Sequence, residues 1–458
     1  MNLRILHVTL SNPKTHTQGL NRYCLDLAET QAGNGDKIHI LYAGSPYSIK
    51  SGIAKKKKKN GVQYWKLNRA LPEPIMYGVS EPMRYRHKCD RVQFEKYLKD
   101  VHPDVIHVHS VQGVYLEFFE CAHEMSIPII YTVHDFFPMC LRCNLVDNNG
   151  QYCERIISSD VCAACNISAD KNHLMQMIVQ SEIYSLIKRN PLVVALKKKF
   201  LGKKVRKPEE EKQEKEPKIK SITIWEYRTL MEYYEKILSL FDVVHFNSEV
   251  TKDICMRIRR FPESCVLPIT HTGIRDAQTH RRGRVLRVSY MGGYTPNKGI
   301  DVLKKALGRL PKDGWRASIY GSGTEKNEKG QIRECGEFRG KKETENVWNN
   351  TDLLVVPSTC PETFGYVVLE AVSRGIPVIC SSLTGAKCVL GPAENELTFP
   401  VGNDEILAEK IWKFTNLRYY ERIQDSLIAH SHWQEIESHE RDINALYRRT
   451  IQKIKYGH

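Results

Sequence analysis

Two glutamates near a glycine turn are the first residues in this chain whose types and spacing suggest chemistry. The apolar run Leu353–Pro357 leads into a turn that holds Glu362 and Gly365, and Glu370 follows in an apolar segment typical of a helix. A strand, a turn and a helix in this order direct free backbone N–H groups toward one edge of a sheet, where they suit a diphosphate. Carboxylates do not hold phosphate, so we expect both glutamates to accept hydrogen bonds from sugar or ribose hydroxyls. The alternative is that Glu362 caps the helix and Glu370 lies on a solvated face.

A lysine on a second glycine loop is the best candidate for a cation in the same site. Gly292 and Gly293 end the run 288–291, and Lys298 stands just before the apolar helical pattern 299–310. A fixed cation there would stabilise a departing nucleoside diphosphate without a divalent metal. The alternative is an ordinary solvated surface lysine.

Five cysteines form a third candidate site. Cys140 and Cys143 are two residues apart in a Cys-x2-Cys pair, Cys162 and Cys165 form another such pair, and Cys153 lies between them. Paired thiolates at this spacing are typical of a structural tetrahedral zinc site. Five thiols do not all bind one zinc, so the choice of ligands stays open. The alternative is a reduced loop whose thiols pair only under oxidation.

The elements that must position these residues alternate between strand and helix. Short apolar runs predict strands, and runs with apolar residues at a spacing of three to four predict helices. This alternation indicates parallel sheets covered on both faces, so the predicted fold class is α/β, with two Rossmann-like doubly wound domains facing a central cleft. The predicted strands are 4–10, 37–43, 105–109, 127–133, 242–246, 285–291, 317–320, 353–357 and 377–380, and the main predicted helices are 20–32, 91–101, 175–187, 225–241, 299–310, 365–374, 405–414 and 433–454.

The predicted domains divide the chain near residue 280. Residues 1–280 form an N-terminal domain for the acceptor, with the cysteine cluster at 140–165 and a charged insertion at 197–220. Residues 281–430 form a C-terminal domain for a nucleotide sugar, and 431–458 form a helix that packs back on the first domain. Open α/β sheets bind ligands at the carboxyl ends of their strands, so both domains should face one cleft.

The motifs taken together resemble family 4 of the glycosyltransferases, which have the GT-B fold. The segment from Glu362 to Gly365, followed by Glu370, is similar to the signature of that family. Further similar segments follow in the expected order along nearly the whole chain, the charged insertion excepted: 104–109, 131–135, 241–248, 288–299, 319–323, 352–358 and 375–379.

The resemblance implies roles for individual residues. His134, Lys298 and Glu362 would be catalytic, with His134 touching the transferring sugar from the first domain; a satisfied core histidine is the alternative. Glu370 would take the ribose hydroxyls, and Phe364 has a second interpretation as packing against the sheet. The implied donor-binding set is Gly19, Gly292, Gly293, Lys298, Glu362, Thr363, Phe364, Gly365 and Glu370.

Three departures from the family pattern stand out. The family has arginine where this chain has Gly293, it often has two glycines where this chain has only Gly19, and the loop at 383–387 lacks the expected acid. Some relatives carry cysteines at the positions of Cys140, Cys153, Cys162 and Cys165, which implies a different ligand quartet from the two pairs.

The implied function is a retaining glycosyl transfer from a UDP- or GDP-sugar to a glycan or lipid-linked acceptor, in bacterial surface polysaccharide synthesis. No cofactor is expected for catalysis, with structural zinc as a possible addition. The alternatives are a nucleotide-sugar epimerase or other GT-B enzyme, and a catalytically silent scaffold. Dinucleotide redox chemistry lacks support because no G-x-G-x-x-G follows a strand.

Charge and composition bear on partners and location. The chain has 458 residues, 41% of them hydrophobic, and a net charge of +15, the profile of a globular protein with a polyanionic partner. Lys55–Lys59 and 197–207 carry twelve basic residues, a concentration that suits an anionic membrane surface better than nucleic acid; a solvated loop is the alternative. No apolar run is long enough to span a bilayer and the first strand is too broken for a signal peptide. We therefore expect a cytoplasmic protein, peripheral at the inner face of the plasma membrane.

Overall fold

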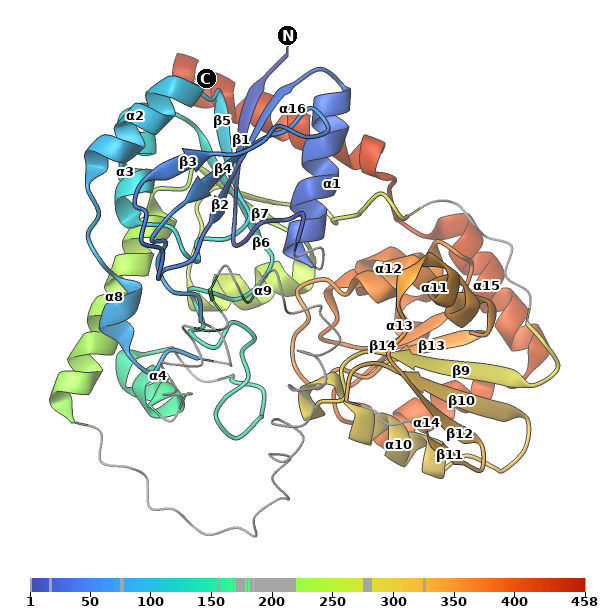
Figure 1. Ribbon diagram of the computed structural model, residues 1–458. Coiled ribbons are helices and arrows are strands. Elements are labelled where there is room, and N and C mark those ends of the chain that lie inside the picture. The colour runs from blue at the N-terminus through green and yellow to red at the C-terminus, as the bar shows by residue number, and fades with distance from the viewer. Residues whose placement is uncertain are drawn as a thin grey trace.

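The computed structural model describes residues 2–15, 19–74, 78–154, 157–167, 220–274, 282–323 and 327–457, with isolated positions between 169 and 184. They form two α/β domains, each built on one twisted sheet (Figure 1). The predicted fold class is confirmed. The insertion at 197–219 and most of the predicted helix 175–187 lie outside the described residues.

The first sheet has eight strands in the order β3-β4-β2-β1-β5-β6-β7-β8. All neighbours are parallel except β3, which pairs antiparallel with β4. The strands are β1 (Arg4–Thr9), β2 (Lys37–Ala43), β3 (Ile53–Lys55), β4 (Gln63–Leu67), β5 (Val105–Val108), β6 (Ile129–Val133), β7 (Val243–Phe246) and β8 (Ser264–Val266).

Helices cover both faces of this sheet. One face packs under α1 (Leu20–Gly33), and the other under α2 (Arg91–Val101), α3 (Leu116–Glu124) and α8 (Ser221–Ser239). The remaining helices are α4 (Ser159–Asn166), α9 (Glu249–Ile258) and the short 3₁₀ turn η1 (Pro82–Tyr85). Four consecutive interior strands, β1, β5, β6 and β7, are almost wholly buried, which explains their continuous apolar runs.

The second sheet has seven strands in the order β11-β12-β10-β9-β13-β14-β15, parallel except for β11. Its strands are β9 (Leu286–Met291), β10 (Trp315–Tyr320), β11 (Asn327–Lys329), β12 (Ile332–Gly336), β13 (Leu353–Val356), β14 (Val378–Ser381) and β15 (Thr398–Phe399). Its helical segments are η3 (Pro296–Lys298), α10 (Ile300–Gly308), α11 (Gly340–Asn349), α12 (Tyr366–Val372), η4 (Gly385–Ala393), α13 (Glu394–Leu397), α14 (Asp404–Lys413) and α15 (Leu417–His430).

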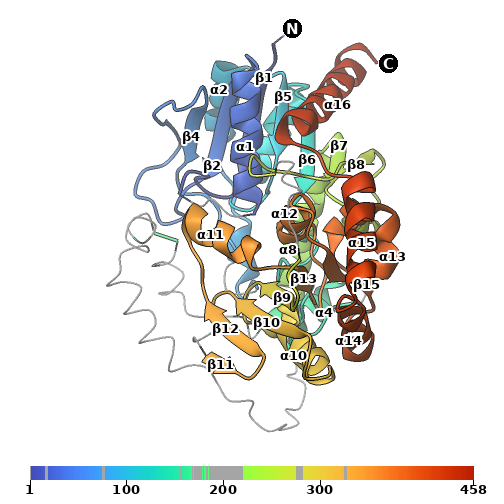
Figure 2. The same cartoon turned by 90° about the vertical axis from the view of Figure 1, so that its right-hand side faces the viewer.

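The last helix, α16 (Ile436–Tyr456), leaves the second domain and packs against α1 of the first (Figure 2). Tyr447 and Ile443 of α16 are fully buried in the core that also holds Tyr23 and Leu27 of α1. Chain end and chain start thus share one hydrophobic layer. None of the described helices has the length and apolar character needed to cross a membrane.

Candidate functional site

The turn that carries Lys298 is hydrogen-bonded to the segment after β13. Thr359 donates from its backbone N–H to the Asn297 carbonyl (3.0 Å) and from its hydroxyl to the Pro296 carbonyl (3.1 Å). Gly299 has φ 72°, and a Cβ there would lie 1.7 Å from the Pro357 carbonyl oxygen. Only glycine fits this approach, so Gly299 allows the two loops to lie against each other.

This close approach brings Lys298 and Glu362 together. The Lys298 ammonium lies 2.9 Å from Glu362 Oε1, and the Ser358 hydroxyl donates to the same oxygen. The Lys298 side chain is 38% exposed and that of Glu362 is 14% exposed. The pair is therefore partly open to solvent, with the lysine the more accessible partner.

The backbone around Glu362 runs beside the loop after β14. Glu362 donates to the Leu383 carbonyl (3.1 Å), Gly385 donates to the Glu362 carbonyl (2.9 Å), and Ala386 donates to the Phe364 carbonyl (2.7 Å). A Cβ on Gly385 would lie 2.0 Å from the Thr363 carbonyl oxygen. This extended pairing fixes the position of the Glu362 backbone.

Thr363 joins the two domains. Its hydroxyl donates to the backbone carbonyl of His134, at 2.8 Å, and its own carbonyl accepts from the hydroxyls of Ser248 (2.7 Å) and Thr251 (2.8 Å). Ser248 and Thr251 lie in the first turn of α9, where Ser248 caps the helix. The residues predicted to face each other across the cleft, His134 and the Glu362 segment, are in contact.

His134 follows β6 and is half-buried. Its Nε2 lies 3.3 Å from Nδ1 of His109, and its ring packs against that of Tyr23 at 5.0 Å between centroids. Burial lowers the pKa of His134 to about 3, so the ring is neutral at physiological pH. A neutral imidazole can exchange hydrogen bonds with a sugar but does not supply a positive charge.

The neighbouring Asp135 is held by two donors. Gln112 Nε2 donates to Oδ2 (3.0 Å) and the Phe137 backbone N–H donates to Oδ1 (2.9 Å). Burial nevertheless raises the pKa of Asp135 to about 7.

Glu370 lies on α12 and is contacted by one residue on α1 and one that follows β8. His271 Nε2 lies 3.0 Å from Glu370 Oε1, and Arg22 of α1 lies 3.6 Å from the same oxygen. His271 Nδ1 accepts from the Gly273 backbone N–H (3.0 Å), so the neutral ring donates to Glu370 through Nε2. Both contacts are made to Oε1, an arrangement that suits the predicted contact of Glu370 to a diol.

The predicted glycines occupy different environments. Gly19 precedes α1, is exposed and has φ 55°. A Cβ on Gly292 would lie 2.9 Å from the Tyr290 hydroxyl, whereas one on Gly293 would meet nothing closer than 3.9 Å. Gly365 precedes α12 with φ 101°, close to the Glu362 carboxylate. A side chain therefore fits at Gly293 but not easily at the other loop positions.

Phe364 is 3% exposed and packs in the core, with its ring 5.6 Å from that of Tyr366. Of its two predicted roles, the described structure places the side chain in packing. Sequence reasoning missed Arg22, His271, Ser358, Ser248 and Thr251. Four of them have partners 99 to 348 residues away in sequence, so no local pattern identifies these four. Ser358 lies only four residues before Glu362, within the same segment.

The cysteines divide into a group of four and one outlier. Burial, together with the nearby thiols of Cys140, Cys165 and Cys153, raises the pKa of Cys162 to about 12. Cys143 lies beside Asp135 and Cys140, and its sulfur is 4.0 Å from Gln112 Nε2. The donor chemistry of the four fits a zinc ion, but the described cysteines do not form a group with ligand atoms within 4.8 Å of one another.

Such a close group exists among three buried histidines, His7, His107 and His109. Their ring nitrogens already face hydrogen-bond partners: Gln31 and His109 for His7, Tyr447 and Thr132 for His107, His7 and His134 for His109. These contacts favour a hydrogen-bonded network over a metal site.

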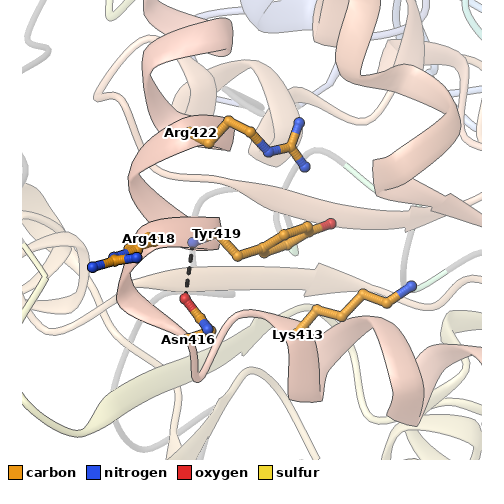
Figure 3. A pocket seen from close by; sticks show the side chains of 5 residues that line it. All are labelled: Lys413, Asn416, Arg418, Tyr419 and Arg422. Atoms are coloured by element: carbon orange, nitrogen blue, oxygen red, sulfur yellow. Dashed lines mark hydrogen bonds between the residues drawn. The ribbon is translucent and has the colours of Figure 1, made fainter.

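A surface hollow lies at the turn between α14 and α15 (Figure 3). It is lined by Lys413, Asn416, Arg418, Tyr419 and Arg422, and Asn416 caps α15 by accepting from the Tyr419 backbone N–H at 3.1 Å. None of the predicted donor-binding residues lines it.

Comparison with known families decides the identity of both domains. Residues 17–159 match the family described as Glycosyltransferase Family 4, and residues 286–416 match Glycosyl transferases group 1. The chain belongs to family 4 of the glycosyltransferases. The alternative of an epimerase finds no support in these comparisons.

Curated relatives of this family 4 chain cover part of it. A phosphatidyl-myo-inositol mannosyltransferase of Propionibacterium freudenreichii is 33% identical over 136 residues, 28% of this chain and 35% of the relative. An exopolysaccharide phosphotransferase of Streptomyces coelicolor is 31% identical over 127 residues, 25% of this chain and 13% of the relative. The matches thus span about a third or less of these relatives.

Solved GT-B structures match the glycosyltransferase fold over almost the whole chain. Sucrose-phosphate synthase of Thermosynechococcus elongatus superposes with a TM-score of 0.55 at 16% identity, covering 97% of this chain and 98% of that chain. HepE of Anabaena, solved with UDP and glucose, gives 0.53 at 13% identity, covering 98% and 100%. At these identities the match establishes the fold.

Proposed function

We propose that this protein is a retaining glycosyltransferase that moves a sugar from a nucleoside diphosphate to a glycan or lipid-linked acceptor. The observation that carries the proposal is the Lys298–Glu362 pair, held 2.9 Å apart directly beside the Thr363 contact to His134. One cation, one carboxylate and one neutral imidazole thus surround the meeting point of the two domains.

Each group has a chemical task in this proposal. Lys298 stabilises the negative charge that develops on the leaving diphosphate, since a fixed cation needs no reorganisation during the reaction. Glu362 orients Lys298 and accepts from hydroxyls of the donor, and Glu370 accepts from the ribose. His134 contacts the transferring sugar from the first domain. No divalent metal is needed for these steps.

The test is donor turnover by the full chain. We expect release of the nucleoside diphosphate from UDP-glucose, GDP-mannose or another member of a panel of UDP- and GDP-sugars, with EDTA present. Lys298→Ala and Glu362→Gln should each lower kcat/KM about 100- to 1,000-fold, the range seen when one charge-stabilising group is removed.

The control is Lys413→Ala, which removes the more exposed Lys413–Glu409 pair (2.8 Å) on α14. All three variants should melt close to the wild type, because partly exposed ion pairs contribute about 1 kcal/mol or less. Absence of binding and turnover with every donor, or full activity of Lys298→Ala, would contradict the proposal.

We further propose that the protein works at an anionic membrane surface. Lys56–Lys59 are exposed in the loop between β3 and β4, and the matched mannosyltransferases are named for a phosphatidyl-inositol acceptor. Lysines near such a surface contribute on the order of 1 kcal/mol each. Sedimentation with phosphatidylglycerol vesicles should weaken with salt and on replacing Lys56–Lys59 by glutamine; unchanged binding would contradict this role.

We also propose that the thiols of Cys140, Cys153, Cys162 and Cys165 hold a structural zinc ion. Zinc would draw the four sulfurs closer and keep them as thiolates. Elemental analysis should find about one zinc per chain, lost in Cys162→Ser and retained in Cys143→Ser, whose thiol lies outside the quartet. Metal-free wild-type protein would refute this site.

A further inference from the structure

A chain of hydrogen bonds runs from two carboxylates, one buried and one half-buried, on one side of the first domain to His134 at the cleft. It begins at Asn444 of α16, whose amide nitrogen lies 2.6 Å from Glu440 Oε1 and 3.1 Å from Asp36 Oδ2. A carboxylate only accepts hydrogen bonds, so the Asn444 atom that faces these oxygens is its NH₂ group. The Asn444 carbonyl oxygen is thereby left for its next neighbour.

That neighbour is Gln31 of α1, which is fully buried. Gln31 Nε2 lies 3.0 Å from Asn444 Oδ1, and Gln31 Oε1 lies 2.8 Å from His7 Nε2. Since the amide nitrogen donates to Asn444, the amide oxygen faces His7 and accepts from it. His7 therefore carries its proton on Nε2.

The same argument fixes the direction of hydrogen-bond donation at two more rings, those of His7 and His109. Burial lowers the pKa of His7 to about 4 and the pKa of His109 well below its ordinary value, so both are neutral and each has one N–H. His7 Nδ1 must accept, and His109 Nε2, 3.0 Å away, donates to it. His109 Nδ1 must then accept from His134 Nε2 at 3.3 Å.

His134 has only one proton in its neutral form, and the chain assigns it to Nε2. Within the described part of the chain, the His134 ring forms its hydrogen bond through Nε2, and this half-buried ring lies beside the contact with Thr363 of the second domain. The remaining lone pair is therefore available at the cleft.

We propose that His134 presents an unprotonated Nδ1 to the cleft as hydrogen-bond acceptor for a hydroxyl of the donor sugar. Gln31 is a positioning residue that sets this tautomer through His7 and His109. The role at the sugar rests on the proposed function, whereas the tautomer does not. Because the amides of Gln31 and Asn444 stand between the histidines and the carboxylates, the chain fixes a proton in place and does not carry one away.

A second chain in the same core supplies an internal reference. His245 Nε2 lies 2.7 Å from the Leu267 carbonyl, to which it must donate, and its Nδ1 accepts from the Thr132 hydroxyl (2.8 Å). Gln31 also reaches this chain, since it is hydrogen-bonded to Tyr447, which leads through His107 and Thr132 to His245. The Leu267 carbonyl nevertheless sets the His245 tautomer, because a backbone carbonyl only accepts. This tautomer should stay unchanged when Gln31 is replaced.

The tautomers can be measured without activity. In the full-length protein with ¹⁵N-labelled histidine, long-range ¹H–¹⁵N correlation spectra distinguish protonated from unprotonated ring nitrogens, and His134→Gln assigns the His134 signals. At pH 7.5 we expect the Nε2–H form of both His134 and His245. A His134 ring protonated on Nδ1, or on both nitrogens, overturns the proposal whether or not the protein transfers sugar.

Two variants of Gln31 test whether this residue sets the tautomer of His134. Gln31→Lys offers only donors to His7 and should reverse the chain, placing the His134 proton on Nδ1; Gln31→Glu keeps the acceptor and should leave it on Nε2. If the lysine variant does not fold, Gln31→Met removes both polar groups and should give mixed tautomers. His134 signals that are identical in wild type and in the folded lysine or methionine variant overturn the role of Gln31.

The effect on activity is measured as kcat/KM with whichever of UDP-glucose and GDP-mannose the wild type turns over. Gln31→Lys should lower kcat/KM about tenfold or more, because a donor then faces the sugar hydroxyl, and Gln31→Glu should stay within about threefold of wild type. A reversed tautomer with unchanged kcat/KM overturns the contact to the sugar. Failure of the wild type on both donors counts against the proposed function and leaves the tautomer measurement standing.

Discussion

At the scale of single residues, the lack of a side chain at Gly293 bears on how the protein binds its donor. Family 4 has arginine at this position by the resemblance of the loop, and this chain has none. The backbone there does not require glycine, since a Cβ would meet only Ser322 Oγ and Thr295 Oγ1, both at 3.9 Å. A lack of space for a Cβ therefore does not explain the absence of arginine at this position.

We predict that Gly293→Arg folds and strengthens donor binding. A guanidinium forms charge-assisted hydrogen bonds to phosphate, worth about 1.5–3 kcal/mol, so the donor Kd should fall about tenfold or more. Isothermal titration with the nucleotide sugar measures this change.

The control is Gly308→Arg, which adds the same charge at the C-terminal end of α10, where a Cβ meets nothing within 4 Å. Equal gains in both variants would point to a general charge effect. No gain at residue 293 would mean that the diphosphate does not reach this loop.

At the scale of elements, the contact between the domains depends on how closely two loops approach α9. The Thr363 carbonyl accepts from both Ser248 and Thr251, and Gly385 packs against that carbonyl from the other side. A glycine is required here because of space, although its φ is not in the left-handed region.

We predict that Gly385→Ala weakens the interface between the domains. Its Cβ would lie 2.0 Å from the Thr363 oxygen and 2.6 Å from Ser248 Oγ, so the loop must shift and its hydrogen bonds to α9 lengthen. Overpacking of this kind costs about 1–3 kcal/mol. We expect a lower Tm, a larger radius of gyration by small-angle scattering and reduced transfer.

Gly308→Ala is the matched substitution at an open position and should alter none of these three quantities. If Gly385→Ala keeps the wild-type Tm and radius, the Thr363 contact does not hold the domains together.

At the scale of the whole molecule, the buried histidines couple stability to pH. Burial lowers the pKa of His134 and His439 to about 3 and that of His7 and His245 to about 4. Unfolded histidine titrates near pH 6.5, so below this pH the unfolded chain binds more protons. Each histidine then removes up to about 1.4 kcal/mol per pH unit as the pH falls from 6.5 toward 4.

Two carboxyl groups change the free energy of unfolding with pH in the opposite direction. Burial raises the pKa of Asp135 to about 7 and that of Glu73 to about 8, so their contribution is present at low pH and is lost as the pH rises through these values. The histidines outnumber them, and we predict that the free energy of unfolding rises from pH 4.5 to 6.5 and declines between 7 and 8.

Thermal melting at constant ionic strength measures this profile. His439→Gln removes one titrating ring and should flatten the acid side relative to wild type. A Tm that stays constant or rises as the pH falls from 6.5 to 4.5 would show that these rings are charged in the native state.

Periodicity in the sequence predicted most of the α/β framework. The expected strand 37–43 and helix 91–101 agree with β2 and α2, and most other predicted elements differ by one to three residues at their ends. The two edge hairpins, β3–β4 and β11–β12, were missed because their strands are short and partly exposed. The helices α3, α9, α11 and α15 were also missed. In α15 the apolar face is narrow beside many charged residues.

The sequence by itself determined the family, the α/β class and the types of residue in the site, because motifs and apolar periodicity are local. Only the tertiary structure decided which of them meet. Lys298 reaches Glu362 because Gly299 lets two distant loops touch, and Thr363 meets His134 across 229 residues. The proton on His134 is assigned through Gln31 and Asn444, which lie 413 residues apart in sequence and 3.0 Å apart in space. Such contacts depend on packing between elements, which no short stretch of sequence encodes.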